Sequence, residues 1–278
     1  MHAPRQILTA LLGIAVTAGF DLQAQSAADI INGMVSEFER QTRNVENYTV
    51  VQETMGVETV SYFEKEMVSG HPVFRLRQVR AGGTVVRGDE AEQERWDAFY
   101  TMAPEIIARA SYEGRDNIGG NAVHVVSVRD LQEIGFKPAA TQSDQDFVPS
   151  RARLFIDADQ SLMRRMVFEG VMTTQGEAHD VTATVDLSDY RAVDGMLHPF
   201  TMEMTMEGLA QALDPEAQEQ YEEMKRQLEA MPAEQRKMVE GMMKDRMAQF
   251  EQMMGSGDMK VEVRVKEVRV NSGPPGDQ

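Results

Sequence analysis

Residues 189–207, DYRAVDGMLHPFTMEMTME, decide the fold of this chain. In their last seven positions Met202, Met204 and Met206 alternate with threonine and glutamate. Because successive strand side chains point to opposite faces, the three methionines share one side of a predicted strand. Methionine is unbranched and polarizable, so a sheet face lined by it suits an apolar ligand of variable shape.

The dipeptide Asp194-Gly195 lies just before this strand and is a reverse-turn signal. It predicts an antiparallel hairpin between the methionine strand and a strand that ends near Tyr190. Alternating segments punctuated by glycine-rich turns extend the pattern towards the N-terminus. They predict strands over residues 48–55, 59–67, 73–79, 110–114, 122–128, 152–156, 162–172, 181–190 and 200–206.

The third of these strands alternates in character, since Phe74 and Leu76 are separated by Arg75 and Arg77. One face of it is therefore expected to be apolar and the other cationic.

A further strand begins at Met259, where Val261, Val263 and Val265 share a face. Val268 and Val270 are one residue out of phase with them. This predicts a β-bulge near Lys266 and Glu267.

Helical patterns flank the predicted strands. Ser26 and Asp29 form a capping-box signature, and the apolar spacing behind them predicts a helix over residues 27–43. Aromatic and aliphatic residues around Trp96 have helix-like spacing, and Pro104 fits the first turn of a short second helix.

Residues 215–254 have the pattern of a helical hairpin, inserted at 208–257 before the last strand. Nine methionines lie between Met224 and Met259. Three interpretations remain open for them: Cu(I) ligation by thioethers, apolar packing along the hairpin seam, or a flexible surface that adapts to a lipid or a protein partner.

Bulk properties restrict the class of protein. Residues 1–24 have the layout of a signal peptide, with Arg5 before the uncharged run 7–20 and small residues after it. There is no cysteine, so neither disulfides nor N-terminal lipidation is available. A net charge of -17 disfavours nucleic acid and anionic lipid headgroups. We expect a periplasmic protein without stable membrane insertion, with one domain over residues 25–270 and a disordered tail over 271–278.

Catalytic signatures are lacking in the sequence. There is no cysteine nucleophile, HExxH, phosphate-binding glycine loop or GxSxG elbow. The five histidines are scattered without metal-ligand spacing. The sequence therefore predicts a protein that is not an enzyme and has neither cofactor nor metal.

Three strings resemble the LolA-type outer-membrane lipoprotein-sorting proteins: YEGRDNIGGNAVHVVSV, ARLFIDADQSLMRRMVFEG and DLSDYRAVDGMLHPFTMEMTM. The resemblance covers residues 27–207 and the last strand. It implies an α+β fold, a half-open antiparallel β-barrel of about 10–11 strands wrapped on an N-terminal helix, with an apolar cavity. In the carriers of this family that cavity takes lipoprotein acyl chains. The inserted hairpin departs from the family pattern.

Two hypotheses follow. In the first, the protein is an exported carrier or sensor that binds a lipid or lipoprotein acyl chain. Its expected inner-face residues are Phe74, Leu76, Met202, Met204, Met206, Val261, Val263 and Val265. In the second, the protein is an envelope interaction module that binds a protein partner without a ligand. Its expected partner or lid residues are Trp96, Tyr221, Met224, Leu228, Val239, Met243, Met247 and Phe250.

Overall fold

The computed structural model describes residues 26–68, 70–82, 84–87, 102–134, 147–174, 177–208, 223, 226–228, 231 and 258–276. The predicted signal peptide, Trp96 and most of the predicted helical hairpin lie outside these residues. Within the described part, no helix has the length and apolarity that crossing a membrane requires.

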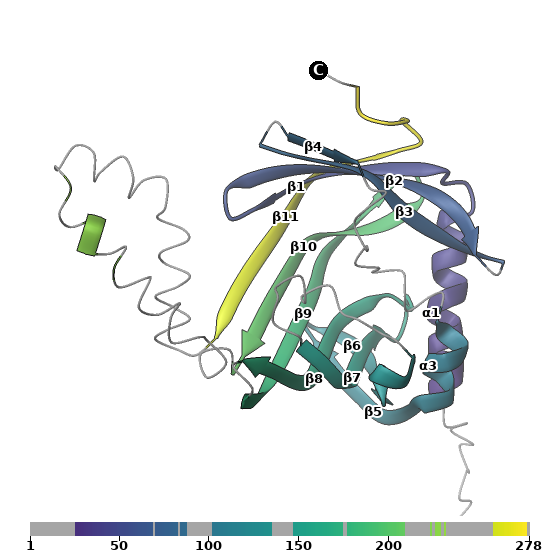
Figure 1. Cartoon of the computed structure of the whole chain (residues 1–278). Coiled ribbons are helices and arrows are strands. Elements are labelled where there is room, and N and C mark those ends of the chain that lie inside the picture. The colour runs from purple at the N-terminus through teal and green to yellow at the C-terminus, as the bar shows by residue number, and fades with distance from the viewer. Residues whose placement is uncertain are drawn as a thin grey trace, which may run out of the picture.

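Eleven antiparallel strands form one sheet in the order β4-β3-β2-β1-β11-β10-β9-β8-β7-β6-β5 (Figure 1). Their bounds are β1 Asn47–Thr54, β2 Val57–Val68, β3 His71–Ala81, β4 Thr84–Arg87, β5 Ala110–Ile118, β6 Asn121–Arg129, β7 Phe147–Asp157, β8 Met163–Thr174, β9 Glu177–Val193, β10 Met196–Glu207 and β11 Met259–Val270. The described helices are α1 Ala27–Thr42, α3 Ala103–Arg109 and the 3-10 turn η1 Leu131–Ile134.

The sheet curls, and α1 runs along one side of it, from β5 near one end of the helix to β3 near the other (Figure 1). Residues of α1 contact β3, β5, β10 and α3. The described residues thus form an open, curled antiparallel sheet with few helices, consistent with the expected half-open barrel.

Both ends of α1 are held by hydrogen bonds. At its start, Ser26 Oγ accepts from Asp29 N at 3.1 Å while the Asp29 carboxylate accepts from Ser26 N at 3.2 Å, which confirms the capping box. At its end, Lys65 Nζ of β2 donates to the carbonyl of Arg43 at 3.0 Å. A cation at this end also complements the helix dipole.

Two local predictions about the sheet are confirmed. Asp194 and Gly195 have φ of 48° and 89°, and Val193 pairs with Met196 on either side of them, as a two-residue hairpin turn requires. In the pairing of β1 with β11, Val51 is opposite Glu267 and Gln52 is opposite Val265. Lys266 is therefore the extra residue of the expected bulge.

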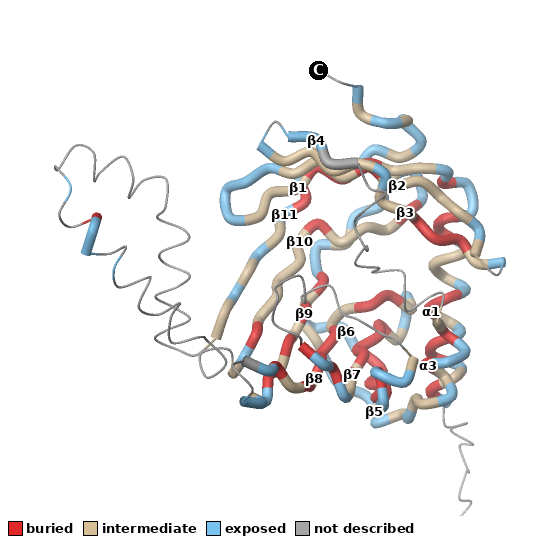
Figure 2. Tube along the Cα trace, in the orientation of Figure 1, coloured by how far each residue is buried: buried red, intermediate tan, exposed pale blue. Residues whose placement is uncertain are grey.

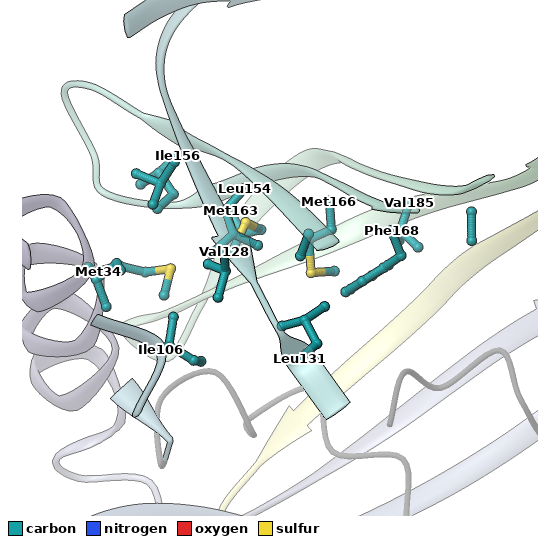
Figure 3. Packing of buried hydrophobic residues seen from close by; sticks show 14 of the residues in the cluster. Met34, Ile106, Val128, Leu131, Leu154, Ile156, Met163, Met166, Phe168 and Val185 are labelled. Atoms are coloured by element: carbon teal, nitrogen blue, oxygen red, sulfur yellow. The ribbon is translucent and has the colours of Figure 1, made fainter. Parts of the chain in front are cut away.

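Buried residues on the inner side of the sheet form two clusters. The large cluster joins α1 and α3 to β6–β10 and includes Met34, Ile106, Leu154 and Phe168 (Figure 3). The aromatic cluster lies at the other end of the sheet, where Figure 2 shows buried segments of β1 and β3. It consists of Val45, Val50, Phe74, Met196, Phe200, Val265 and Val268, with Phe38, Tyr48, Phe63, Val193 and Val270 against it.

Hydrogen bonds connect the segment after β11 to the chain just before β1. Asn271 Oδ1 accepts from Glu46 N at 2.7 Å, and Asn271 Nδ2 donates to the carbonyl of Asn44 at 2.8 Å. Further along, Arg80 Nη2 donates to the carbonyl of Gly276 at 2.9 Å. These hydrogen bonds, which the local composition does not reveal, hold residues 271–276 against β1 and β3.

Candidate ligand-binding face

The three methionines of β10 lie beside a matching apolar row on β11. Met202 is opposite Val263, Met204 is opposite Val261, and Met206 is opposite Met259. We call these six residues the inner strip. Met202, Met204 and Met259 pack against the large cluster, to which Met206 itself belongs.

Strand β9 continues the same face on the other side of β10. Leu187, Val185 and Ala183 are paired with Met202, Met204 and Met206, and all three β9 residues are buried. Each inward position on β9–β11 within these pairings is therefore apolar. This part of the inner face has no charged side chain.

The opposite face of the same strands is charged and paired. Glu203 lies between Met202 and Met204 in sequence, and its carboxylate is 2.8 Å from Lys260 Nζ. Arg165 and Asp186 pair in the same way across β8 and β9, at 2.6 Å. The alternation of residue types thus separates a solvated outer face from an apolar inner face.

Burial differs along the inner strip. Met206 is 4% exposed, whereas Met202, Met204, Val261 and Val263 are only half-buried. Of these four, Met202 and Met204 pack against the large cluster, and Val263 and Val261 lie opposite them on β11. The strip is therefore apolar surface that remains partly accessible among the described residues.

The other predicted inner-face residues lie outside the inner strip. Phe74 and Val265 belong to the aromatic cluster, and Leu76 is half-buried on β3 opposite Phe63. Tyr48 stacks on Phe63 with ring centroids 4.7 Å apart and meets Phe74 at 5.0 Å. The predicted residues share one side of the sheet, but the three methionines belong to or pack against the large cluster, whereas Phe74 and Val265 belong to the aromatic cluster.

The prediction that one face of β3 is cationic is wrong for the assembled sheet. Arg75 Nε lies 2.8 Å from Glu66, and Arg77 Nε lies 3.2 Å from Glu64. Both glutamates come from β2, which pairs with β3. The strand alone shows only the arginines, whereas the pairing of β2 with β3 makes this face charge-balanced.

One histidine is buried and a second is half-buried. Tyr112 Oη is 3.3 Å from His124 Nδ1, and burial followed by the charge of Arg115 lowers the pKa of His124. His198 Nδ1 lies 2.7 Å from the carbonyl of Pro199, and burial lowers the pKa of this imidazole too. Within the described ranges, no three His, Cys, Asp or Glu side chains gather as a metal site would require.

Only one predicted partner residue can be placed. Glu223 and residues 226–228 are helical, and Leu228 is 4% exposed, as a seam position would be. The remaining partner or lid residues are Trp96, Tyr221, Met224, Val239, Met243, Met247 and Phe250, which lie outside the described residues.

No protein-family model matches the sequence, and no curated protein matches it. Several solved structures are similar to it at low sequence identity. The structure is similar to a putative outer membrane lipoprotein-sorting protein domain from Vibrio parahaemolyticus, with 9% identity, a TM-score of 0.42 and coverage of 90% of this chain and 94% of that chain. LolA-superfamily proteins are among the structures it resembles.

Two other structures illustrate that likeness. A DUF1329 family protein from Desulfovibrio piger has 11% identity and a TM-score of 0.38, covering 88% of this chain and 95% of that chain. A LolA superfamily protein from Nitrosomonas europaea has 9% identity and a TM-score of 0.31, covering 88% of this chain and 94% of that chain.

Proposed function

We propose that this protein is a periplasmic carrier or sensor that binds a lipid or lipoprotein acyl chain on the inner strip and catalyses no reaction. The observation that supports the proposal is the half-buried, charge-free row formed by Met202, Met204, Val261 and Val263. Soluble domains bury such continuous apolar surface against something, and a ligand is a natural occupant.

The energetics of an acyl chain fit this surface. Each methylene removed from water contributes about 0.8 kcal/mol, so a chain of about a dozen carbons gains on the order of 10 kcal/mol before the cost of association. That gross gain requires no charge on the protein. The uncharged inner positions of β9–β11 are consistent with a ligand held by apolar contact alone.

Methionine also explains how one site could take chains of different shape. Its side chain has three rotatable bonds and a polarizable thioether, so it repacks around an irregular occupant more easily than valine or isoleucine. Met202 and Met204 on β10 lie between buried Leu187 and Val185 of β9 and the half-buried valines of β11.

The proposal is tested with a fluorescent long-chain fatty acid and two matched variants. Met204→Asp places a carboxylate in the middle of the inner strip, while Thr205→Asp places it on the opposite face of the same strand, beside Lys260. We expect Met204→Asp to weaken binding of the probe by at least about tenfold, since a buried charge is costly. We expect Thr205→Asp to leave binding unchanged.

Far-UV circular dichroism and the urea midpoint establish that both variants are folded. Equal affinity of the two folded variants for the probe would remove the inner strip from the binding site. A wild-type protein that ignores the probe, and that carries no lipid after gentle purification, would contradict the carrier function itself.

A further inference from the structure

The inner strip also places three methionines next to one another on two paired strands. Met206 and Met259 are directly opposite each other on β10 and β11, and Met204 is the next inward residue on β10. Cβ atoms of directly opposite residues lie about 4.5–5.5 Å apart, and those of diagonal neighbours lie at about 7–8 Å. Three thioethers on flexible side chains at these spacings can reach a common point.

All three residues pack in the same cluster. Met206 is one of its buried members, and Met204 and Met259 are half-buried against it. In sequence, they bracket the insertion 208–257, since Met206 precedes it by two residues and Met259 follows it by two. The three residues therefore lie where the insertion leaves and rejoins the sheet.

The chemistry of the three thioether sulfurs determines which metal ion they would bind. Thioether sulfur is a soft ligand that suits Cu(I), whereas Zn²⁺ and Cu²⁺ prefer imidazole, thiolate or carboxylate groups. The chain has 21 methionines and no cysteine, so thioethers are its only soft donors. The inward neighbours Val261, Val185 and Ala183 supply no competing nitrogen or oxygen ligand.

We propose that Met204, Met206 and Met259 form a Cu(I) site at the base of the insertion. A monovalent soft ion needs no anionic ligand in such a site. The apolar surroundings disfavour the divalent, strongly hydrated metals. The inference goes beyond acyl-chain binding, since it depends on the sulfur atoms and not on the apolarity of the strip.

Substitution by leucine distinguishes the apolar character of these three methionines from their ability to bind a metal through sulfur. Replacement of methionine by leucine keeps the volume and the apolar character but removes the sulfur. A triple variant with Met204→Leu, Met206→Leu and Met259→Leu therefore lacks the ligands while preserving the apolar strip. The control triple variant carries Met55→Leu, Met67→Leu and Met196→Leu, which lie apart on the β1–β2 turn, the end of β2 and the start of β10.

The experiment is an anaerobic titration of each full-length protein with Cu(I), in competition with bathocuproine disulfonate. We expect the wild type and the control triple variant to bind one more equivalent of Cu(I) than the site triple variant. Cu²⁺ and Zn²⁺ should show no such difference. Binding of the fluorescent fatty acid should be equal in the wild type and the control triple variant, whose three substitutions lie outside the inner strip.

Equal Cu(I) stoichiometry in the wild type and the site triple variant would overturn the proposal, as would the same loss in the control. Neither result would affect acyl-chain binding, which the fatty acid measures separately. If the site triple variant does not fold, methionine ε-methyl NMR of the wild type decides. The signals of Met204, Met206 and Met259 must then shift together at one equivalent of Cu(I), and unchanged signals would refute the site.

Discussion

Strands β7 and β8 differ from strands β10 and β11 in what lies on their inner side. Leu154 of β7 is fully buried and Met166 of β8 is 2% exposed, in the cluster that also contains residues of α1, α3 and η1. Met204 of β10 packs against this cluster but is only half-buried, as is Val261 of β11 opposite it. The alternation of residue types decides which side of a strand is apolar. The helices that cover the sheet decide which part of that side is excluded from water.

This difference explains why one curled sheet can both fold stably and keep an apolar surface for a ligand. The covered strands contribute most of the hydrophobic stabilisation through α1 and α3 (Figure 3). The inner strip contributes less hydrophobic stabilisation. A ligand can therefore replace contacts of the inner strip without unfolding the protein.

The largest effect is expected at the hairpin between β7 and β8, on the covered side of this comparison. The Asp157 carboxylate accepts from the backbone N of Gln160 at 2.9 Å and lies 2.8 Å from Arg164, with both side chains largely buried. Asp157→Ala leaves the Arg164 charge unpaired, and we expect the free energy of unfolding to fall by about 3–5 kcal/mol in urea titrations. Asp159→Ala, exposed on the same turn, is the control and should be close to neutral.

Asp157 also makes the stability of the protein depend on pH. Burial alone would raise the pKa of its carboxyl, but the Gln160 N–H and Arg164 outweigh it, so the pKa lies below the ordinary value. The resulting stability is present at neutral pH and is lost as the pH falls below about 4. A wild type and an Asp157→Asn variant with parallel stability curves between pH 5 and 2 would contradict this assignment.

A pair of core truncations tests the comparison directly. Leu154→Ala removes a fully buried side chain from the covered region and should cost about 2–5 kcal/mol. Met204→Ala removes a half-buried one from the inner strip and should cost about 1 kcal/mol. Urea titrations measure both losses in the free energy of unfolding, provided that its dependence on urea concentration has the same slope in each variant. Equal losses would mean that the strip is packed as tightly as the core.

A smaller effect is expected at the other end of the open strands. Asn271 follows β11, and its side chain bonds to the backbone of Asn44 and Glu46. Asn271→Ala should lower the free energy of unfolding by about 1 kcal/mol. Ser272→Ala, exposed at the next position, provides the control. Indistinguishable melting curves for the two variants would show that this connection does not stabilise the sheet.

The smallest effect concerns one histidine from each cluster region. Burial lowers the pKa of His124 and His198 in the folded state, so the unfolded chain binds protons more readily. Stability is therefore complete above the ordinary histidine pKa and declines as the pH falls from 7 to 5. The double variant His124→Gln and His198→Gln should show a flatter decline in urea midpoint over this range. A decline as steep as that of the wild type would exclude these two side chains as its cause.

Local features of the fold could be predicted from the sequence. The capping box at Ser26, the turn at Asp194-Gly195 and the bulge at Lys266 depend on neighbouring residues and on strand periodicity. The pairing of Arg75 with Glu66 could not be predicted in this way, because the two residues meet only when β2 pairs with β3.

The candidate site, too, could be predicted only in part from the sequence. The sequence by itself determined that Met202, Met204 and Met206 share a face, because alternation is a property of every strand. Only the tertiary structure decided that Met206 is buried and Met204 is half-buried, and that Phe74 and Val265 belong to a different cluster. The reason is physical: a side chain's direction is set by its own backbone, whereas its burial is set by distant segments that the curled sheet and α1 bring over it.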